Sequence, residues 1–223
     1  MELEQKFMAK RLIYILIAFL AVSGFAATQG SLIDKRDGKK YKTVKIGDQT
    51  WMAENLNYDV DSSFCYNNRE CNCAKYGRLY TWAAAVGKSE DACGFGHTCS
   101  LPSGNIQGIC PDGWHLPSKE EFEALFVAVG GKDVAGMKLK STSGWKENGN
   151  GDDAFGYSAL PAGNRLNNGF YRNEGYYANF WSSSEDDSYL AYYMGLYYGS
   201  DNADPNYDSK NDGLSVRCLK DSQ

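Results

Sequence analysis

Seven cysteines are the residues of this sequence whose type and spacing most directly suggest chemistry. Cysteines form disulfides in oxidising compartments, whereas clusters of cysteine and histidine hold zinc. Cys71 and Cys73 are separated by one residue, fewer than the roughly two to four that separate zinc-binding cysteines, and His97 and His115 are the only histidines. We therefore expect disulfides and no metal site. The seven positions are Cys65, Cys71, Cys73, Cys93, Cys99, Cys110 and Cys218.

Aromatic residues are the second chemical feature, with twelve between Phe170 and Tyr207, nine of them tyrosines. Mixed with Ser, Asn, Asp and Gly, this composition is typical of recognition surfaces, because tyrosine gives a large contact area at a small entropic cost. Alternate tyrosines also pack small β-sheets without binding a ligand, and both interpretations stay open here. The residues expected to bind ligand are Tyr176, Tyr177, Trp181, Glu185, Tyr192, Tyr197 and Tyr198.

Acidic residues surround the same region and offer the oxygen atoms that calcium prefers. Their spacing matches no known calcium loop, and residues 148–153 lack the glycine and terminal glutamate of an EF-hand. We expect a solvated acidic rim and no cofactor, with calcium as the alternative. The residues are Glu185, Asp186, Asp187, Asp201, Asp204, Asp208 and Asp212.

No catalytic constellation is recognisable in the sequence. His115 lies inside a Cys-Pro-Asp-Gly-Trp-His turn, and we expect it to be a structural residue. Carboxylates are plentiful, but nothing indicates that two of them face each other as a glycosidase requires. The sequence therefore predicts a protein that is not an enzyme, and catalysis is a less favoured alternative.

The N-terminus has the order of a secretory signal peptide: Lys6, Lys10 and Arg11, then an uncharged run over residues 12–22, then small residues. That run has eleven residues, fewer than the roughly 20 that a membrane-spanning helix needs. We expect a signal peptide over residues 1–26 and a mature chain, 27–223, without a transmembrane segment. The mature protein is expected to be secreted or held at the cell surface, with the periplasm as the alternative.

The charge of the chain argues against nucleic acid as a partner. The formal net charge is −5, and removal of residues 1–26 takes away three basic and two acidic side chains, which leaves −6. Binding to a phosphate backbone requires a strongly basic face. We therefore expect no nucleic acid partner.

The first half of the chain contains several recognisable elements. Residues 41–46 and 49–52 read as two strands joined by Gly47-Asp48, and the alanine-rich end of residues 74–86 reads as helical. Residues 87–109 suit a surface loop that Cys93 and Cys99 close. After Pro117, Ser118 and Glu121 form a capping-box pattern, and an apolar face from residue 122 to 129 ends at Gly130-Gly131, which predicts a helix of about three turns.

The second half reads as short strands separated by turns. We expect strands at residues 156–160, 180–182 and 190–198. In the last expected strand, residues 214–219, apolar residues alternate with Ser215 and Arg217, so one face should enter the core and deliver Cys218 to the interior.

Several motifs carry a resemblance to a known family over nearly all of the mature chain. The chain resembles the Fibrobacter succinogenes major paralogous domain, an exported bacterial module, with a core at roughly residues 34–221. The motifs are Asp37-Gly38-Lys39 with residues 41–47, Trp51-Met52-Ala53-Glu54-Asn55-Leu56, Tyr76-Gly77-Arg78-Leu79-Tyr80, residues 110–117, residues 155–163, Trp181-Ser182-Ser183-Ser184-Glu185 and Ser215-Val216-Arg217-Cys218.

A wider resemblance joins the chain to C-type-lectin-like and formylglycine-generating, sulfatase-activating domains. It implies a single α+β domain of short, mostly antiparallel strands with one or two helices, stapled by disulfides. It transfers no function, because such folds host binding and catalysis alike. The sulfatase-activating domains use two reactive cysteines, whereas Cys110 and Cys218 are expected here to form a staple.

The family resemblance implies three disulfides: Cys65 with Cys73, Cys93 with Cys99, and Cys110 with Cys218. Cys71 is left over, and a Cys65–Cys71 pair is the alternative in the first loop. An unpaired thiol in an exported protein is a candidate for an intermolecular bond.

These observations together predict an exported, non-catalytic binding or adhesion module. It would recognise a polysaccharide or an extracellular protein through the Tyr-, Asn-, Ser- and Asp-rich surface after residue 165. The alternative is a structural surface protein that associates with copies of itself through its tyrosines.

Overall fold

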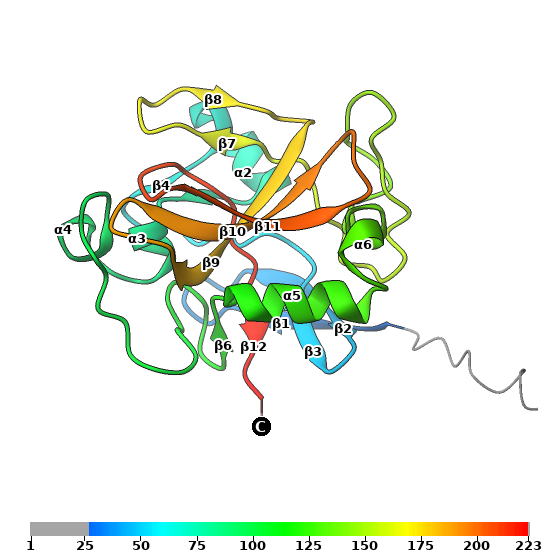
Figure 1. Cartoon of the computed structure of the whole chain (residues 1–223), viewed down its shortest axis with the longest axis horizontal. Coiled ribbons are helices and arrows are strands. Elements are labelled where there is room, and N and C mark those ends of the chain that lie inside the picture. Colours follow the sequence, from blue (N-terminus) through cyan, green and yellow to red (C-terminus); the bar gives the residue numbers. More distant parts are fainter. Residues whose placement is uncertain (1–26, 223) are drawn as a thin grey trace, which may run out of the picture.

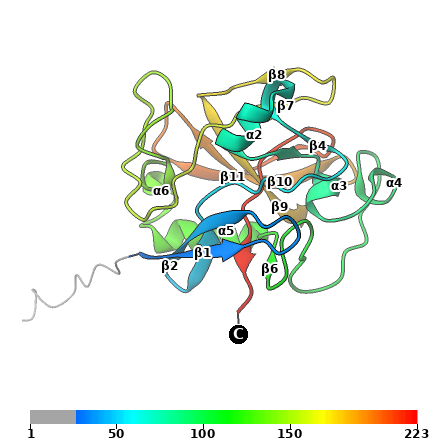
Figure 2. The ribbon, with the colours of Figure 1, turned by 180° about the vertical axis from the view of Figure 1, so that it is seen from behind.

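The computed structural model describes residues 27–222, so the expected signal peptide lies outside the described residues. Short, mostly antiparallel strands and a few short helices make up an α+β fold, as the sequence predicts. Figure 1 shows helix α5 (Lys119–Ala128) in front, with a three-stranded sheet above it and a five-stranded sheet below and behind it. Figure 2 shows the opposite side, where the five-stranded sheet faces the viewer.

The five-stranded sheet joins the two ends of the described chain. The predicted hairpin over residues 41–52 is confirmed, and Gly47 adopts the positive φ of 58° that its turn requires. The strand order is β1 (Thr28–Ile33), β2 (Lys40–Ile46), β3 (Gln49–Met52), β12 (Leu219–Lys220) and β6 (Trp114–His115).

The three-stranded sheet carries five tyrosines: Tyr177, Tyr192, Tyr193, Tyr197 and Tyr207. Its order is β11 (Ala203–Ser209), β10 (Leu190–Tyr197) and β9 (Tyr177–Glu185), all antiparallel, so the strands predicted around residues 180–182 and 190–198 are confirmed. The register between β9 and β10 shifts between Ala191 and Tyr193. Phe180, Met194 and Leu196 are buried against α5, so one face of this sheet is core.

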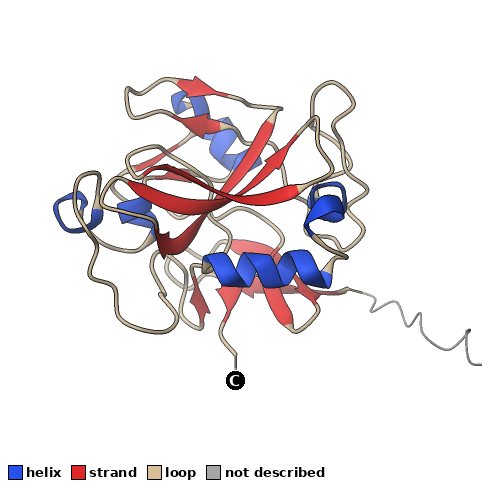
Figure 3. Ribbon diagram, in the orientation of Figure 1, coloured by secondary structure: helices blue, strands red, loops and turns tan. Residues whose placement is uncertain are grey.

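Helix α5 begins and ends where the sequence predicts. The hydroxyl of Ser118 accepts a hydrogen bond from the backbone N–H of Glu121, and the Glu121 carboxylate accepts one from the backbone N–H of Ser118. Gly130 and Gly131, with φ of 111° and 104°, follow its last turn. Phe122 and its apolar neighbours pack between the two sheets, which explains the position of α5 in Figure 3.

Helix α6 (Lys132–Leu139) was not predicted from the sequence. A glycine, Gly136, stands at its centre and lowers its helix propensity. A Cβ atom at this glycine would lie 2.2 Å from the carbonyl oxygen of Asn202, so the helix packs directly against the backbone that precedes β11. The close approach of the Asn202 carbonyl leaves no room for a side chain at position 136, which explains why a glycine stands in this helix.

The remaining elements are short. The alanine-rich stretch forms α3 (Trp82–Ala85), as predicted, and the Thr81 side chain caps it by accepting from the backbone N–H of Ala84. The segment predicted as a loop over residues 87–109 contains one helical turn, α4 (Glu90–Cys93). The others are β4 (Ser63–Phe64), the 3₁₀ turn η1 (Tyr66–Asn68), α2 (Glu70–Tyr76), β5 (Leu79–Tyr80), β7 (Asn164–Arg165) and β8 (Tyr171–Arg172).

Of two further expected strands, one is absent and the other is shorter than predicted. Residues 156–160 form no strand, and Ala159 makes only an isolated bridge to Lys140. Of residues 214–219, only the end belongs to a named strand, β12, and the expected alternation is absent because Ser215 and Arg217 are also buried. This segment runs between the sheets and is covered on both sides, whereas alternation requires one solvated face.

The three disulfides are the pairs that the resemblance implies: Cys65–Cys73, Cys93–Cys99 and Cys110–Cys218. Cys71 is exposed and unpaired, with all seven cysteines in the described part of the chain. Within residues 27–222, no helix has the length and apolar character needed to cross a membrane.

Candidate ligand-binding surface

Two residues expected to bind ligand have structural roles. Trp181 is completely buried, and its indole N–H donates to the carbonyl of Tyr80 at 2.7 Å. The Glu185 carboxylate accepts hydrogen bonds from the backbone N–H of Cys99 and from the ammonium group of Lys210, which is itself completely buried. Trp181 is therefore a core residue, and Glu185 holds the Cys93–Cys99 loop against the sheet.

Four of the expected residues come together at one end of the β9–β10 pair. The rings of Tyr177 and Tyr197 lie 4.9 Å apart, those of Tyr176 and Tyr198 lie 5.1 Å apart, and Tyr197 contacts Tyr198 at 4.5 Å. Most of these contacts are edge-to-face, which is the favoured geometry for aromatic pairs. We call Tyr176, Tyr177, Tyr197 and Tyr198 the four-tyrosine cluster. Tyr197 is its most exposed member, at 37%.

A buried lysine holds the backbone beneath the four-tyrosine cluster. Lys140 is 2% exposed, and its ammonium group donates to the carbonyls of Tyr197 at 3.2 Å and Ser200 at 2.9 Å. Burial lowers the pKa of Lys140. A hydrogen bond with Tyr197, together with Glu147, raises the pKa of Tyr198 to about 12, so its phenol stays protonated at neutral pH. The cluster is therefore an aromatic surface on a fixed backbone.

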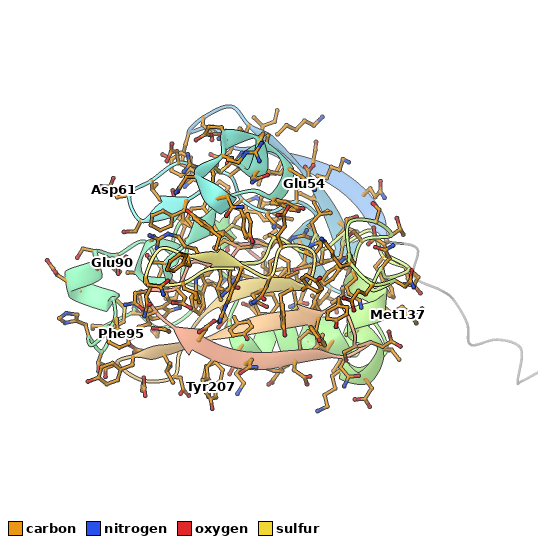
Figure 4. All side chains as sticks on the ribbon, turned by 90° about the horizontal axis from the view of Figure 1, so that it is seen from above. Glu54, Asp61, Glu90, Phe95, Met137 and Tyr207 are labelled. Carbon is orange, nitrogen blue, oxygen red and sulfur yellow. A yellow bond between two sulfur atoms is a disulfide. The ribbon has the colours of Figure 1, made fainter. Side chains whose placement is uncertain are left out.

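The remaining expected residue, Tyr192, lies in a groove between α5 and β11. The groove has a volume of about 510 Å³. The Tyr192 and Tyr207 rings stand 6.4 Å apart at 88°, and the Lys119 ammonium group lies 4.4 Å from the centre of the Tyr192 ring. Figure 4 labels Tyr207, which projects from β11 at the rim of the molecule. We call this the tyrosine groove, lined by Lys119, Glu123, Phe126, Val127, Lys132, Tyr192, Pro205, Asn206 and Tyr207.

Most residues of the tyrosine groove were not predicted from the sequence. Tyr207, which is 55% exposed, is one of the twelve clustered aromatic residues. Lys119, Glu123 and Val127 follow one another at intervals of four residues, so they share one face of α5. That spacing is a signal, but the sequence alone does not tell which strand faces this side of the helix.

The open edge of β11 is protected against pairing with another strand. β11 is the outermost strand of its sheet and contains Pro205, which has no N–H to donate. The backbone N–H groups of Tyr207 and Ser209 donate to the side chains of Asn206 and Asp208, respectively. Proline and such local bonds disfavour strand addition. A ligand in the tyrosine groove would therefore contact side chains rather than extend the sheet.

The acidic residues expected to form a rim do not converge within the described residues. There, the only group of three His, Cys, Asp or Glu side chains close enough to hold a metal contains Glu70 and the disulfide-bonded Cys65 and Cys73. Asp212 is 4% exposed, and burial, together with Asp208, raises its pKa to about 6. Asp212 accepts a hydrogen bond from the backbone N–H of Asn167, which gives it a structural role.

His115, which we expect from the sequence to be a structural residue, lies between two carboxylates. Its ring is buried, with Nδ1 at 2.6 Å from Asp221 and Nε2 at 3.0 Å from Glu121, the residue that caps α5. Burial lowers the pKa of His115, but hydrogen bonds and charge attraction from both carboxylates outweigh this effect and raise it. His115 therefore ties the start of α5 to the C-terminal segment, and protonation of its ring strengthens this link.

The raised pKa of His115 predicts a loss of stability with rising pH. The folded state binds this proton more tightly than the unfolded state, so the stabilisation is present below the unfolded pKa of 6.5 and is lost as the pH rises through the folded value. We expect a loss of about 1 kcal/mol, because both carboxylates are partly exposed. Urea unfolding between pH 6 and pH 9 should show this step in the wild type. H115Q should lack it, and an identical step in H115Q would contradict the assignment.

Comparison with known proteins identifies one family. A family model described as the Fibrobacter succinogenes major domain matches residues 44–220. The matched range runs from within β2 to the end of β12 and therefore contains both tyrosine-rich sites. No curated protein and no solved structure matches the chain.

Proposed function

Because the chain belongs to the Fibrobacter succinogenes major domain family, we propose that it is an exported, non-catalytic module that binds polysaccharide. Three disulfides fit an extracellular protein. The ligand site in this proposal is the tyrosine groove, and the four-tyrosine cluster is a second contact surface. We propose no cofactor, with calcium as the alternative to be tested.

The single observation that supports this proposal most is the shape and composition of the tyrosine groove. Its volume of about 510 Å³ falls within the range of roughly 300–1,000 Å³ usual for small-molecule sites. Tyr192 and Tyr207 form a right-angled corner in which a sugar ring can stack on one aromatic face and contact the edge of the other. Lys119, Glu123 and Asn206 supply donors and acceptors for sugar hydroxyls beside the two rings.

We propose in addition that the fold is C-type-lectin-like. The observations in favour are the capped helix α5 after strand β6, the terminal segment between the sheets, and the disulfide that joins the two regions. An experimental structure superposed on lectin-like domains tests this assignment. A common order of strands around the central helix is the expected result, and a different order would contradict it.

The proposed function is tested by retention of the oxidised mature protein on insoluble neutral polysaccharides and on a glycan array, with calcium and with chelator. Y192A/Y207A should lower affinity at least about 30-fold, since central aromatic anchors contribute roughly 2 kcal/mol or more. Y189A is the matched control, because Tyr189 is 50% exposed and contacts Phe95 edge-to-face outside the groove. Y177A/Y197A measures the contribution of the four-tyrosine cluster.

The same experiment separates the alternative functions. Retention that Y192A/Y207A leaves unchanged would rule out the tyrosine groove as the sugar site. If no glycan retains the wild type, the proposal fails, and association of the purified protein with itself or with an extracellular protein becomes the better explanation. Binding that disappears with chelator would establish the calcium alternative.

A further inference from the structure

A second hollow, on the side of the molecule shown in Figure 2, has a different chemistry from the tyrosine groove. It has a volume of about 330 Å³ and lies between β2, the segment after β3 and the end of α2. Another hollow beside it shares Lys40, Lys42 and Glu54 and adds Gln29, Gly30 and Ser31. We call the two hollows together the basic pocket.

Positive charge is concentrated in the basic pocket although the whole chain is acidic. Its lining includes five cationic side chains and a single carboxylate, in a chain of formal net charge −5. A cleft lined by one sign of charge focuses the field and raises the local concentration of oppositely charged ligands. The cations are Lys39, Lys40, Lys42, Lys75 and Arg217, and the carboxylate belongs to Glu54.

Within residues 27–222, three of the cations have no acidic partner, and one of them, Lys75, places its ammonium group 4.4 Å from the centre of the Tyr76 ring. In the described part of the chain, Lys40, Lys42 and Lys75 form no salt bridge with an acidic residue. The Glu54 carboxylate accepts a hydrogen bond of 2.6 Å from the backbone N–H of Lys42 and forms no salt bridge with the three lysines, so the lining keeps a net positive charge. The other two cations have partners: Lys39 pairs with Asp37 at 3.1 Å, and Arg217 is buried beneath the pocket.

The chemistry of these three groups indicates the ligand. A lysine ammonium group is a point charge on a flexible stem, whereas the planar guanidinium of arginine suits one carboxylate held by two bonds. Several lysines in two adjoining hollows therefore suit a polymeric ligand that carries one anionic group on each of several successive monomers. We propose that the basic pocket binds an anionic oligosaccharide, with carboxylate- or sulfate-bearing sugars in the adjoining hollows.

This inference does not depend on the proposed function of the tyrosine groove, because the two sites share no lining residue. Its test is affinity electrophoresis of the oxidised mature protein in gels that contain polygalacturonate, dextran sulfate, neutral dextran or polyglutamate. We expect retardation by the acidic polysaccharides that weakens with added salt, and none by neutral dextran. The two acidic polymers distinguish a carboxylate ligand from a sulfate ligand.

The variant K42A/K75A removes two cationic side chains of the pocket and should lower affinity for the acidic polysaccharide at least tenfold. K88A/K220A is the matched control, because both lysines are exposed, lie outside the basic pocket and change the net charge equally. It should bind like the wild type, as should Y192A/Y207A. Absence of retardation in the wild type, equal losses in both lysine variants, or stronger binding to polyglutamate than to either polysaccharide would overturn the inference.

Discussion

Replacing both Cys110 and Cys218 with alanine should lower the free energy of unfolding by about 4.7 kcal/mol, the value that the chain-entropy relation gives for a loop of roughly 100 residues. The two cysteines are separated by 108 positions and are completely buried. Their bond joins the segment before β6 to the terminal segment between the sheets. Without this bond, most of the domain gains conformational freedom in the unfolded state. Urea unfolding of the mature protein, residues 27–223, measures the effect.

The Cys93–Cys99 bond provides the matched control for this prediction. It spans only 6 positions, and the same relation gives roughly 2 kcal/mol for so short a loop. C93A/C99A should therefore lose less than half as much stability as C110A/C218A. Equal losses in the two variants would show that closure of the long loop is not what stabilises the domain.

The fold was predictable where a local signal and the packing agree. The hydrogen bonds between Ser118 and Glu121 join residues three positions apart, so a short stretch of sequence is enough to predict the start of α5. The β2–β3 turn is equally local. Helix α6 was missed because Gly136 has low helix propensity and is explained only by its contact with Asn202, which lies far along the chain.

The candidate sites were predictable only in part, because they combine distant segments. The tyrosine content indicated the region that contains the proposed tyrosine groove, but Trp181 is a core residue and Tyr207 was not among the expected ligand-binding residues. Side chains alternate between the two faces of a strand, but this alternation does not tell which tyrosines are exposed when both faces of the sheet are covered in part by other elements. In β10 the register also shifts, after Ala191. The tyrosine groove needs α5 beside β11, a contact of tertiary packing that no local pattern contains.

Arg217 shows why the terminal segment misled a prediction from alternation. Its side chain was expected to face away from the core, yet it is 1% exposed. The guanidinium donates to the Asn55 side chain at 2.8 Å, to the carbonyl of Ser158 at 3.0 Å and to the carbonyl of Tyr157. It also lies 4.4 Å from the ring centre of Tyr157. Burial lowers the pKa of Arg217, but a guanidinium keeps its charge in proteins.

Truncating this side chain should therefore be costly. R217M keeps most of the apolar volume but leaves the Asn55 amide oxygen and the carbonyls of Tyr157 and Ser158 without their donor. A buried acceptor left without its donor typically costs about 1 to 3 kcal/mol, so the loss of three such bonds should lower stability by about 3 kcal/mol or more. R69A is the control, because Arg69 is exposed and should change stability by less than about 0.5 kcal/mol.

Urea unfolding of the oxidised R217M, R217K and R69A proteins distinguishes a hydrogen-bonding role from simple packing. R217K keeps the charge, but its single ammonium group cannot reach in the three directions that the guanidinium serves, so it should recover only part of the lost stability. If R217M were as stable as the wild type, packing alone would explain the buried position. The guanidinium would then not be the link that joins the terminal segment to residues 55 and 157–158.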